Sequence, residues 1–263
     1  MKILAIIGTP TKEDGYTTKT VAALEKNFLS KRDAEFNYIF LEDAKLSGCQ
    51  GKLTCIKFGE QQCPFEGEVS PILNAMKNAD VIIFASPVHC FNVSTLMKNF
   101  IDLLVFQMHR PAFFGKQALV VATAAGAGQK GVLKYLRKTI ANWGFDVVGQ
   151  LGTHGGFFDE EKYQRKLLPT IDKLTDKALA AFDKAELPQP GLAELINFRV
   201  WRSTVSTNED NSPYDWEHWK SSGWLEQDYY FKTKINIFSN GLASMIEKLI
   251  ARAIRNVSVG PVS

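Results

Sequence analysis

The feature that most constrains the fold of this chain is a regular alternation of short apolar runs with amphipathic segments over its first 185 residues. The clearest run is Asp-Val-Ile-Ile-Phe-Ala at residues 80–85, and similar runs occupy residues 2–7, 36–41, 118–122 and 145–151. Between them, apolar residues recur at helical spacing in residues 17–29, 70–79, 94–104, 131–143 and 160–184. Continuous apolar strands are typical of a parallel sheet that is covered on both faces. The alternation therefore predicts an α/β fold, a doubly wound five-stranded parallel sheet with helices on both faces.

The bulk composition excludes several classes of protein. The 263 residues are 45% hydrophobic and 22% charged, with a net charge of +3, which is too small to indicate nucleic acid or a membrane surface as a partner. Apolar runs stay well below the roughly 20 residues that span a bilayer. The N-terminal run ends in Gly-Thr-Pro and indicates a strand rather than a signal peptide. We expect a cytoplasmic protein whose four cysteines stay reduced unless they hold a metal or do redox work.

The composition changes after Leu187-Pro188-Gln189-Pro190, which divides the chain into a domain of residues 1–187 and an extension of residues 188–263. The extension is rich in tryptophan and tyrosine and ends in an amphipathic helical stretch, residues 241–255. The favoured interpretation is a mostly helical appendage that packs on its own domain or on a second subunit. The alternative is that its aromatic side chains cover a cofactor or form a substrate pocket, because aromatic residues suit both roles.

A hydroxyl-rich loop, Gly-Thr-Pro-Thr-Lys-Glu-Asp-Gly-Tyr-Thr-Thr at residues 8–18, joins the first strand to the first helix. Ligands of such sheets bind beyond the carboxyl ends of the strands, and helix N-termini favour phosphate. The loop has neither the GxxxxGK[ST] nor the GxGxxG pattern, so it suits one phosphate monoester, as in FMN. The alternative is that Thr17 or Thr18 merely caps the helix.

A second loop, Ala-Ser-Pro-Val-His-Cys-Phe-Asn-Val-Ser at residues 85–94, follows the third strand. The two loops in this order resemble those of the NADPH-dependent FMN reductase and iron–sulfur flavoprotein group of the flavodoxin-like superfamily. The resemblance covers residues 1–185 and implies a flavodoxin-like fold that binds FMN. It assigns the FMN phosphate to Thr9, Thr11, Tyr16, Thr17 and Thr18, and the flavin ring to Ser86, Pro87, Val88, His89, Cys90 and Phe91.

Two residues depart from the family pattern. Thr11 stands where relatives often carry a basic residue, and the neighbouring Lys12 is a candidate to compensate. His89 replaces a common tyrosine, and we favour a positioning role for it over catalytic proton donation to the reduced substrate. His109, His154 and His218 are isolated in the sequence and are interpreted as structural.

The loop after the fourth strand matches GxGxxG at residues 126–131, but the dinucleotide fold carries that motif on its first strand. The acidic residue expected about 20 positions later would be Asp146, which precedes a strand. The resemblance instead places this loop against the flavin ring, through Thr123, Ala124, Ala125, Gly126 and Gly128.

Cys49, Cys55 and Cys63 resemble the compact cysteine motif of iron–sulfur flavoproteins, with Lys52 in place of its second cysteine. A [4Fe–4S] cluster needs four thiolates as a rule, and Cys90 belongs to the flavin loop. We therefore favour a cluster-free relative, with an iron–sulfur cluster at these three cysteines as the alternative. Zinc is less favoured, because no histidine lies nearby in the sequence.

The predicted function is an FMN-dependent NAD(P)H oxidoreductase that passes electrons to a small acceptor such as a quinone, a free flavin or an azo compound. The alternative is an electron-transfer protein that works with ferredoxin. The resemblance also implies a homodimer or homotetramer.

Overall fold

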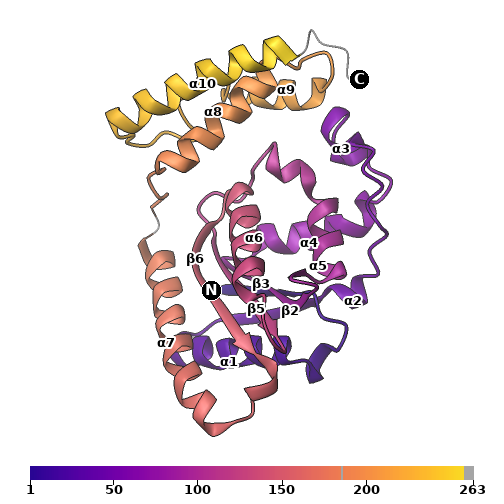
Figure 1. Ribbon diagram of the computed structural model, residues 1–263, viewed down its shortest axis with the longest axis vertical. Coiled ribbons are helices and arrows are strands. Elements are labelled where there is room, and N and C mark those ends of the chain that lie inside the picture. Colours follow the sequence, from indigo (N-terminus) through magenta and orange to yellow (C-terminus); the bar gives the residue numbers. More distant parts are fainter. Residues whose placement is uncertain (185, 258–263) are drawn as a thin grey trace. The chain divides into compact units, whose positions relative to one another are not determined.

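The apolar runs form the parallel sheet that they predict, as seen in the computed structural model of the chain, which describes residues 1–184 and 186–257 (Figure 1). Its strands are β1 (Lys2–Ile7), β2 (Glu35–Phe40), β3 (Val81–His89), β5 (Gln117–Ala124) and β6 (Asp146–His154), in the order β2-β1-β3-β5-β6. All four pairings within this order are parallel. A two-residue strand, β4 (Asn92–Val93), pairs antiparallel with the end of β3.

Helices cover both faces of the sheet (Figure 1). One face carries α1 (Tyr16–Lys31) and α7 (Glu161–Lys184), and the other carries α4 (Glu66–Asn78), α5 (Thr95–Leu103) and α6 (Gln129–Asn142). Short helical turns complete this part of the chain: η1 (Lys12–Asp14), α2 (Leu41–Ala44), η3 (Val105–Met108) and η4 (Gly155–Phe157). The doubly wound, flavodoxin-like architecture predicted from the sequence is therefore present.

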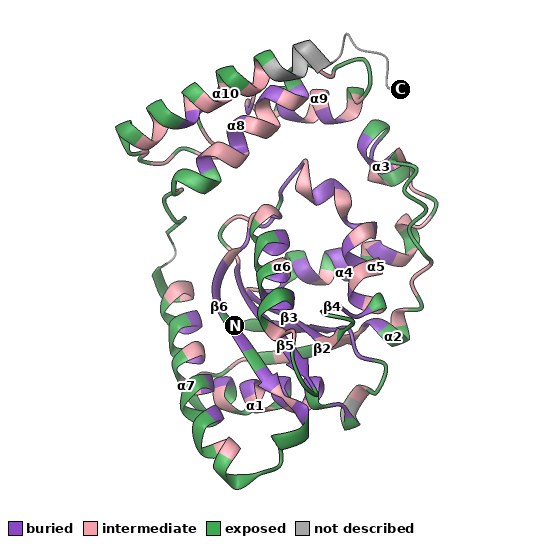
Figure 2. Ribbon diagram, viewed as in Figure 1, coloured by how far each residue is buried: buried purple, intermediate pink, exposed green. Residues whose placement is uncertain are grey.

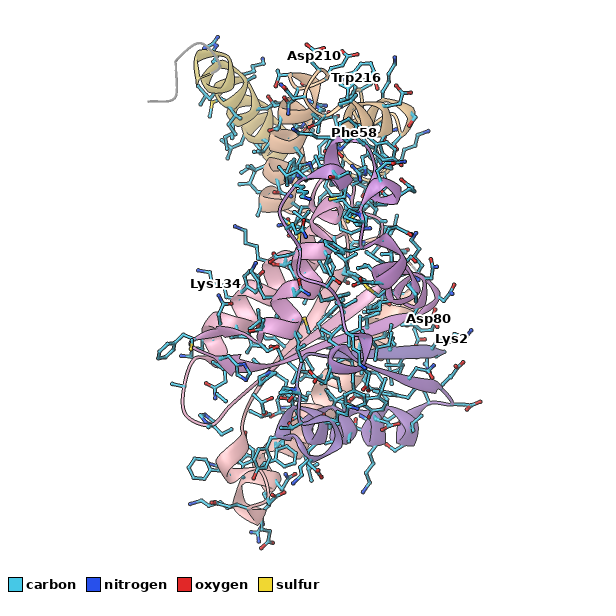
Figure 3. All side chains as sticks on the ribbon, turned by 90° about the vertical axis from the view of Figure 1, so that its right-hand side faces the viewer. Lys2, Phe58, Asp80, Lys134, Asp210 and Trp216 are labelled. Carbon is cyan, nitrogen blue, oxygen red and sulfur yellow. The ribbon has the colours of Figure 1, made fainter. Side chains whose placement is uncertain are left out.

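The central strands β1, β3 and β5 are largely apolar because both of their faces are buried (Figure 2). Val21, Leu24 and Phe28 of α1 pack with side chains of α7 on one face of the sheet. On the other face, the ring of Phe84 lies edge-on to Trp143, with 6.0 Å between the ring centroids. At the amino edge of the sheet, the Lys2 amide donates a hydrogen bond of 2.8 Å to the Asp80 carboxylate, and both residues are labelled in Figure 3.

The chain forms two compact units, and the second is not simply the C-terminal extension. The first unit comprises Met1–Gly51 and Pro64–Glu186, whereas Lys52–Cys63 groups with the chain from Leu187 on. The helices of the second unit are α3 (Thr54–Lys57), η2 (Glu60–Gln62), α8 (Leu192–Ser206), α9 (Pro213–Ser221) and α10 (Ile237–Val257). Within it, Tyr214 of α9 places its hydroxyl 3.3 Å from the Gln61 amide oxygen.

Aromatic residues form much of the core of the second unit. Phe198 stacks on Trp219 at 5.6 Å between ring centroids, and Tyr230 lies edge-on to Trp224 at 4.8 Å. The Trp224 indole also donates a hydrogen bond of 3.0 Å to the Tyr230 carbonyl. Much of the aromatic composition of the extension is thus explained by packing within this unit.

A buried cation fastens α8 to α10. Arg199 is 3% exposed and donates to the Asp228 carboxylate at 2.5 Å and to the Asn240 amide oxygen at 2.7 Å. One turn further along α8, Arg202 holds the Glu247 carboxylate with two hydrogen bonds, of 2.8 and 2.7 Å. Such paired charges are costly to break singly, because the remaining charge would be left buried. Among the described helices, none is both long and apolar enough to cross a bilayer.

Candidate flavin site at the carboxyl edge of the sheet

The strand order creates a switch point between β1 and β3, because the connections from these neighbouring strands lead to opposite faces of the sheet. The loops that follow β1, β3, β5 and β6 meet along this carboxyl edge, where ligands of doubly wound sheets bind. Three of them are the loops singled out in the sequence. The fourth, after β6, was not predicted as part of the site.

The loop after β1 leads directly into the N-terminus of α1. It makes one turn of η1 and then reaches Gly15, the residue that caps α1. No side chain caps the helix and no acidic residue lies in its first turn, all of whose residues are described. The first helical hydrogen bond runs from the Lys19 amide to the Gly15 carbonyl, so the amides of Tyr16, Thr17 and Thr18 lie ahead of the helix ladder.

The threonine hydroxyls of this loop have different surroundings. Thr9, only 4% exposed, lies with its hydroxyl 3.0 Å from that of Thr11. The Thr17 hydroxyl is 2.7 Å from the Thr123 hydroxyl, which belongs to β5. In such a pair one hydroxyl donates and the other keeps its proton for a further acceptor. The Thr18 hydroxyl instead donates to the Lys12 carbonyl and so holds the turn of η1.

The side chains of Lys12 and Tyr16 contact other parts of the protein. Lys12 forms an ion pair of 2.5 Å with Asp43 of α2. Tyr16 packs against Phe158, with 6.0 Å between ring centroids, and a Cβ atom at Gly155 would approach its ring to 2.7 Å. The loop after β6 therefore fixes the side chain of the first residue of α1.

The loop after β3 is a tight hairpin. Val88 pairs with Val93 and His89 with Asn92, so Cys90 and Phe91 are the two residues of the turn. Both have positive φ angles, 48° and 62°, as a type I′ turn requires at its central positions. That conformation favours asparagine and glycine and is unfavourable for side chains such as these. Phe91 is 76% exposed at the tip.

Two buried serines join the hairpin to the loop after β1. The Ser94 hydroxyl donates a hydrogen bond of 2.5 Å to the Gly8 carbonyl and accepts one of 3.2 Å from the Met97 amide, which caps α5. The Ser94 amide donates to the Ser86 hydroxyl at 3.0 Å. Ser86 is fully buried, and its hydroxyl donates to the Pro87 carbonyl at 2.9 Å. These contacts fix the separation of the two loops.

The glycines after β5 differ in what surrounds them. A Cβ atom at Gly126 would meet nothing within 4 Å, so the backbone there is open to approach. Gly128 has a φ of 105°, and a Cβ atom there would lie 2.8 Å from the Val88 side chain. The absence of a side chain at Gly128 therefore leaves room for Val88 of the hairpin. Helix α6 begins at the next residue, Gln129. The loop of residues 125–128 and the hairpin form one packed ridge.

His154 and Gln129 tie the loop after β6 to the start of α6. Ala124 pairs with His154 across the sheet, and the His154 ring lies 3.2 Å from the Gln129 amide nitrogen. The His154 amide donates a hydrogen bond of 2.8 Å to the Tyr163 hydroxyl. From the sequence, His154 is interpreted as structural, and its contacts are with other residues of the chain. Its place beside the loop after β5 follows from the parallel pairing of β5 with β6, which no local sequence pattern indicates.

Comparison with known proteins bears directly on this edge of the sheet. A family model described as NADPH-dependent FMN reductase matches residues 1–156, which include the loops after β1, β3 and β5. The chain belongs to this family.

Two relatives of the chain are named iron-sulfur flavoproteins. An iron-sulfur flavoprotein of Archaeoglobus fulgidus is 26% identical over 229 residues, 86% of this chain and 100% of that protein. An iron-sulfur flavoprotein of Methanocaldococcus jannaschii is 31% identical over 156 residues, 57% of this chain and 76% of that protein.

Solved structures resemble the chain in fold. RosB, in a structure with a bound flavin-phosphate intermediate, superposes with a TM-score of 0.54 at 14% identity, covering 90% of this chain and 92% of that one. The apo form of an NADH:FMN oxidoreductase superposes with a TM-score of 0.50 at 24% identity, covering 66% and 88%. At these identities the similarity concerns the fold alone.

Membership of the FMN reductase family makes the chain an FMN-dependent oxidoreductase, and the loop after β1 fits the FMN phosphate. Three amides point out of the start of α1, where the helix dipole favours an anion. A Cβ atom at Gly15 would collide with the Thr11 hydroxyl and fill the concavity between the loop and the helix. Because Lys12 is paired with Asp43, the groups available to a phosphate here are the helix dipole, backbone amides and hydroxyls.

The cysteines of the predicted cluster motif are divided between the two units. Cys49 belongs to the first unit, where its amide donates a hydrogen bond of 3.0 Å to Asn99, and its side chain is exposed. Cys55 is buried in α3 and Cys63 is half-buried, both in the second unit. Within residues 1–184 and 186–257, no three His, Cys, Asp or Glu side chains are grouped so that they could hold a metal ion.

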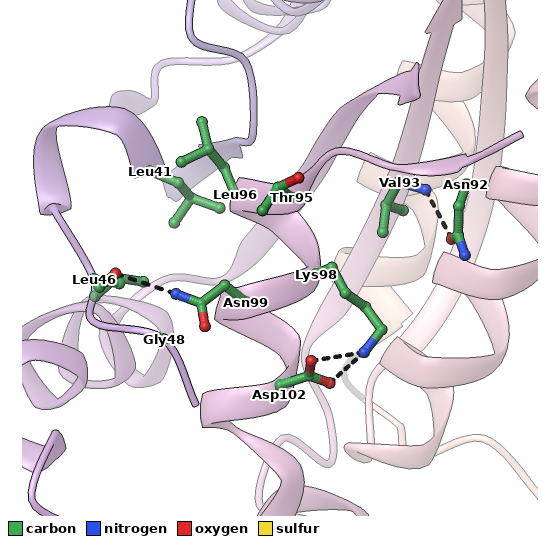
Figure 4. Close-up of a pocket in the computed structure, with 10 residues that line it drawn as sticks. All are labelled: Leu41, Leu46, Gly48, Asn92, Val93, Thr95, Leu96, Lys98, Asn99 and Asp102. Carbon is green, nitrogen blue, oxygen red and sulfur yellow. Dashed lines mark hydrogen bonds and ion pairs between the residues drawn. The ribbon is translucent and has the colours of Figure 1, made fainter. Parts of the chain in front are cut away.

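A pocket of about 550 Å³ lies beside the hairpin (Figure 4). Asn92, Val93 and the first turns of α5 line one side, and Leu41, Leu46 and Gly48 line the other. Lys98 holds Asp102 at 2.6 and 2.7 Å at its rim, and this hydrogen bonding raises the pKa of the Lys98 ammonium. Because these two charges neutralise each other, the pocket suits an uncharged, partly apolar molecule.

Proposed function

We propose that the chain oxidises NAD(P)H with its bound FMN and passes the electrons to a small acceptor such as a quinone, a free flavin or an azo compound. The observation that carries this proposal is the uncapped start of α1, held by Ser94 at a fixed place beside the hairpin. The description of the family, NADPH-dependent FMN reductase, supports a nicotinamide as the electron donor. The acceptor class rests on the size and lining of the pocket beside α5.

Each loop of the site has a task in this proposal. The amides of Tyr16, Thr17 and Thr18 and the hydroxyls of Thr9 and Thr17 bind the phosphate. The peptide groups of Pro87–Phe91 and of residues 123–126 contact the flavin ring. FMN bound there supplies hydride and electron transfer, which requires orientation rather than a strong acid or base from the protein. His89, exposed next to the turn, is placed to donate a hydrogen bond to a molecule on that ridge.

The proposal is tested by anaerobic stopped-flow mixing of the FMN-loaded protein with NADPH and with NADH. We expect the flavin absorbance near its visible maximum to bleach with at least one donor. If neither donor reduces the flavin while dithionite does, the reductase proposal is wrong.

A matched pair of glycine variants connects this activity to the site. Gly15→Ala fills the concavity at the start of α1 and should lower the FMN content of the purified protein. Gly67→Ala, in α4, meets nothing within 4 Å and should leave the FMN content unchanged. Equal FMN content in both variants would place the phosphate elsewhere.

A second candidate function is electron transfer between ferredoxin and another partner through an iron–sulfur cluster. Its basis in the sequence is the motif of Cys49, Cys55 and Cys63, and the name of the relatives in Archaeoglobus fulgidus and Methanocaldococcus jannaschii supports it. Iron and acid-labile sulfide in anaerobically purified protein separate the two candidates. Stoichiometric iron that is lost in Cys55→Ser, together with reduction by reduced ferredoxin, would support the second function. Iron-free protein that turns over NADPH would support the first.

We also propose that the protein works as a homodimer or homotetramer, as the family resemblance implies. A flavin ring lying along an open sheet edge leaves surface that a second subunit can cover. The exposed side chains of the second unit supply an independent argument for assembly.

A further inference from the structure

Helix α10 presents two faces of opposite character. One face is fastened to α8: Ala243 is fully buried, and Glu247 accepts hydrogen bonds from Arg202. Exposed residues recur along α10 (Figure 2), and on this other face they include large apolar side chains. Their exposed fractions are 88% for Phe238, 40% for Leu242, 54% for Met245 and 56% for Leu249.

The spacing of this row, which we name the α10 seam (Phe238, Leu242, Met245 and Leu249), is four, three and four residues. That spacing is the alternation of a and d positions in a heptad, which packs against a second helix as knobs into holes. A strip of two positions in seven is narrower than the apolar face of a helix that lies in a membrane surface. The seam therefore fits one partner helix better than a lipid layer.

The exposed area is large enough for a stable interface. With Ile237, which is 85% exposed beside it, the seam presents on the order of 600 Å² of apolar side chain. Two such surfaces would bury roughly 1,200 Å² together, at the lower end of the range for specific protein–protein interfaces.

The seam is complementary to itself when one copy is reversed. Because four-three-four reads the same in both directions, an antiparallel pair places Phe238 of one copy opposite Leu249 of the other, and Leu242 opposite Met245. Beside the seam, an antiparallel pair brings Ile246 of one copy next to Ser239 of the other, and Lys248 next to Gly241, which has no side chain. No like charges are therefore opposed in this register. A surface that matches its own two-fold copy is what an isologous interface requires.

We propose that the α10 seam binds the α10 seam of a second copy of this chain, antiparallel, across a two-fold axis. This rests on the homo-oligomer proposed above and assigns it a surface. The interface would join second units, so the flavin loops of the first unit need not change for it to form or to break.

The test compares the masses of FMN-loaded variants by sedimentation velocity. Leu242→Glu with Met245→Glu buries four carboxylates in the paired seam and should halve the mass relative to wild type. The matched control is Leu168→Glu on α7, which replaces a leucine that is 53% exposed away from the seam and should keep the wild-type mass. Flavin content and NADPH turnover per flavin should be the same in all three proteins, because no residue of the flavin site is altered.

Charge rescue tests the antiparallel register. Leu242→Glu and Met245→Lys should each dissociate alone, and mixing them should restore the wild-type mass because position 242 of one copy faces position 245 of the other.

Three outcomes overturn the proposal in distinguishable ways. An unchanged mass in the double variant means that the chain assembles through another surface. A wild-type protein that is monomeric at all concentrations also removes the proposed oligomer. Wild-type binding to vesicles of anionic lipid that is lost in the double variant assigns the seam to a membrane surface. Loss of NADPH turnover in every protein would contradict the proposed reaction and leave the interface standing.

Discussion

At the scale of the residue, Thr17 links the first helix to the sheet at the candidate flavin site. Its hydroxyl lies 2.7 Å from that of Thr123, 106 residues away in the sequence. This buried pair positions the first turn of α1 beside the end of β5. Sequence reasoning selected both threonines through the family resemblance, and their contact with each other comes only from the tertiary structure.

Thr17→Val should weaken FMN binding roughly tenfold or more, because a hydrogen bond to a charged phosphate contributes about 1.5–3 kcal/mol. The measurement is the FMN dissociation constant by flavin fluorescence quenching. Thr20→Val is the matched control, since Thr20 is a fully buried threonine on the same helix whose hydroxyl lies 3.1 Å from that of Thr153. The control should lose stability and keep its FMN affinity. Wild-type affinity in Thr17→Val would remove Thr17 from the phosphate site.

At the scale of the element, the hairpin of β3 and β4 departs from what its sequence favours. A two-residue turn with positive φ at both positions usually carries asparagine and glycine, and here it carries Cys90 and Phe91. Strain held at such a position is common where a loop serves a ligand. Burial of the Phe91 side chain does not explain the turn, because Phe91 is 76% exposed at its tip.

Replacing the turn by its preferred residues, Cys90→Asn with Phe91→Gly, should stabilise the protein by about 1–2 kcal/mol, because the left-handed conformation then costs little. The measurement is the midpoint of urea unfolding of the apoprotein. Cys49→Ser controls for the loss of an exposed cysteine and should leave the midpoint unchanged. A lower midpoint in the double variant would show that Phe91 contributes packing that outweighs the strain. If the turn serves the flavin, flavin reduction by NADPH should slow in the stabilised variant.

The elements that could be predicted from sequence are those whose pattern is local. The five apolar runs predicted strands, because a strand in the middle of a covered sheet is apolar on both faces. Their alternation with helices predicted that the sheet is parallel. The hairpin could not be predicted, since Cys-Phe is no turn signal and Pro87 suggested that β3 would end earlier. Ser94 was part of a recognised motif, but its bond to Gly8 joins residues 86 positions apart. The same holds for His154, whose role depends on pairing with β5.

At the scale of the whole molecule, two units of different construction share one chain. The first is a sheet covered by helices, and the second is a set of helices around an aromatic core that includes residues 52–63. This inserted segment was assigned by sequence to the domain of residues 1–187, because no local composition change marks it. Its inclusion means that the chain crosses between units at residues 51–52 and 63–64 as well as near residue 186. Cys55 and Cys63 therefore belong to the second unit, and Cys49 belongs to the first.

Global stability should fall as the pH is lowered through the range in which His109 differs between the folded and unfolded chain. Burial lowers the pKa of His109 from 6.5 to about 4, and the neighbouring Arg110 adds to this effect. Between these two values the unfolded chain binds a proton that the folded chain does not. Protonation thus favours unfolding, and the stability present above pH 6.5 decreases progressively until the pH falls below about 4.

His109→Gln removes this titration. From pH 7 to pH 4, the unfolding free energy of the wild type should fall by up to about 3 kcal/mol more than that of the variant. Urea unfolding followed by circular dichroism at several pH values measures it. His89→Gln is the control, because it replaces a histidine whose side chain is exposed on the hairpin. Parallel stability profiles for wild type and His109→Gln would show that His109 takes up its proton without unfolding the first unit, which would require the loop after η3 to open locally instead.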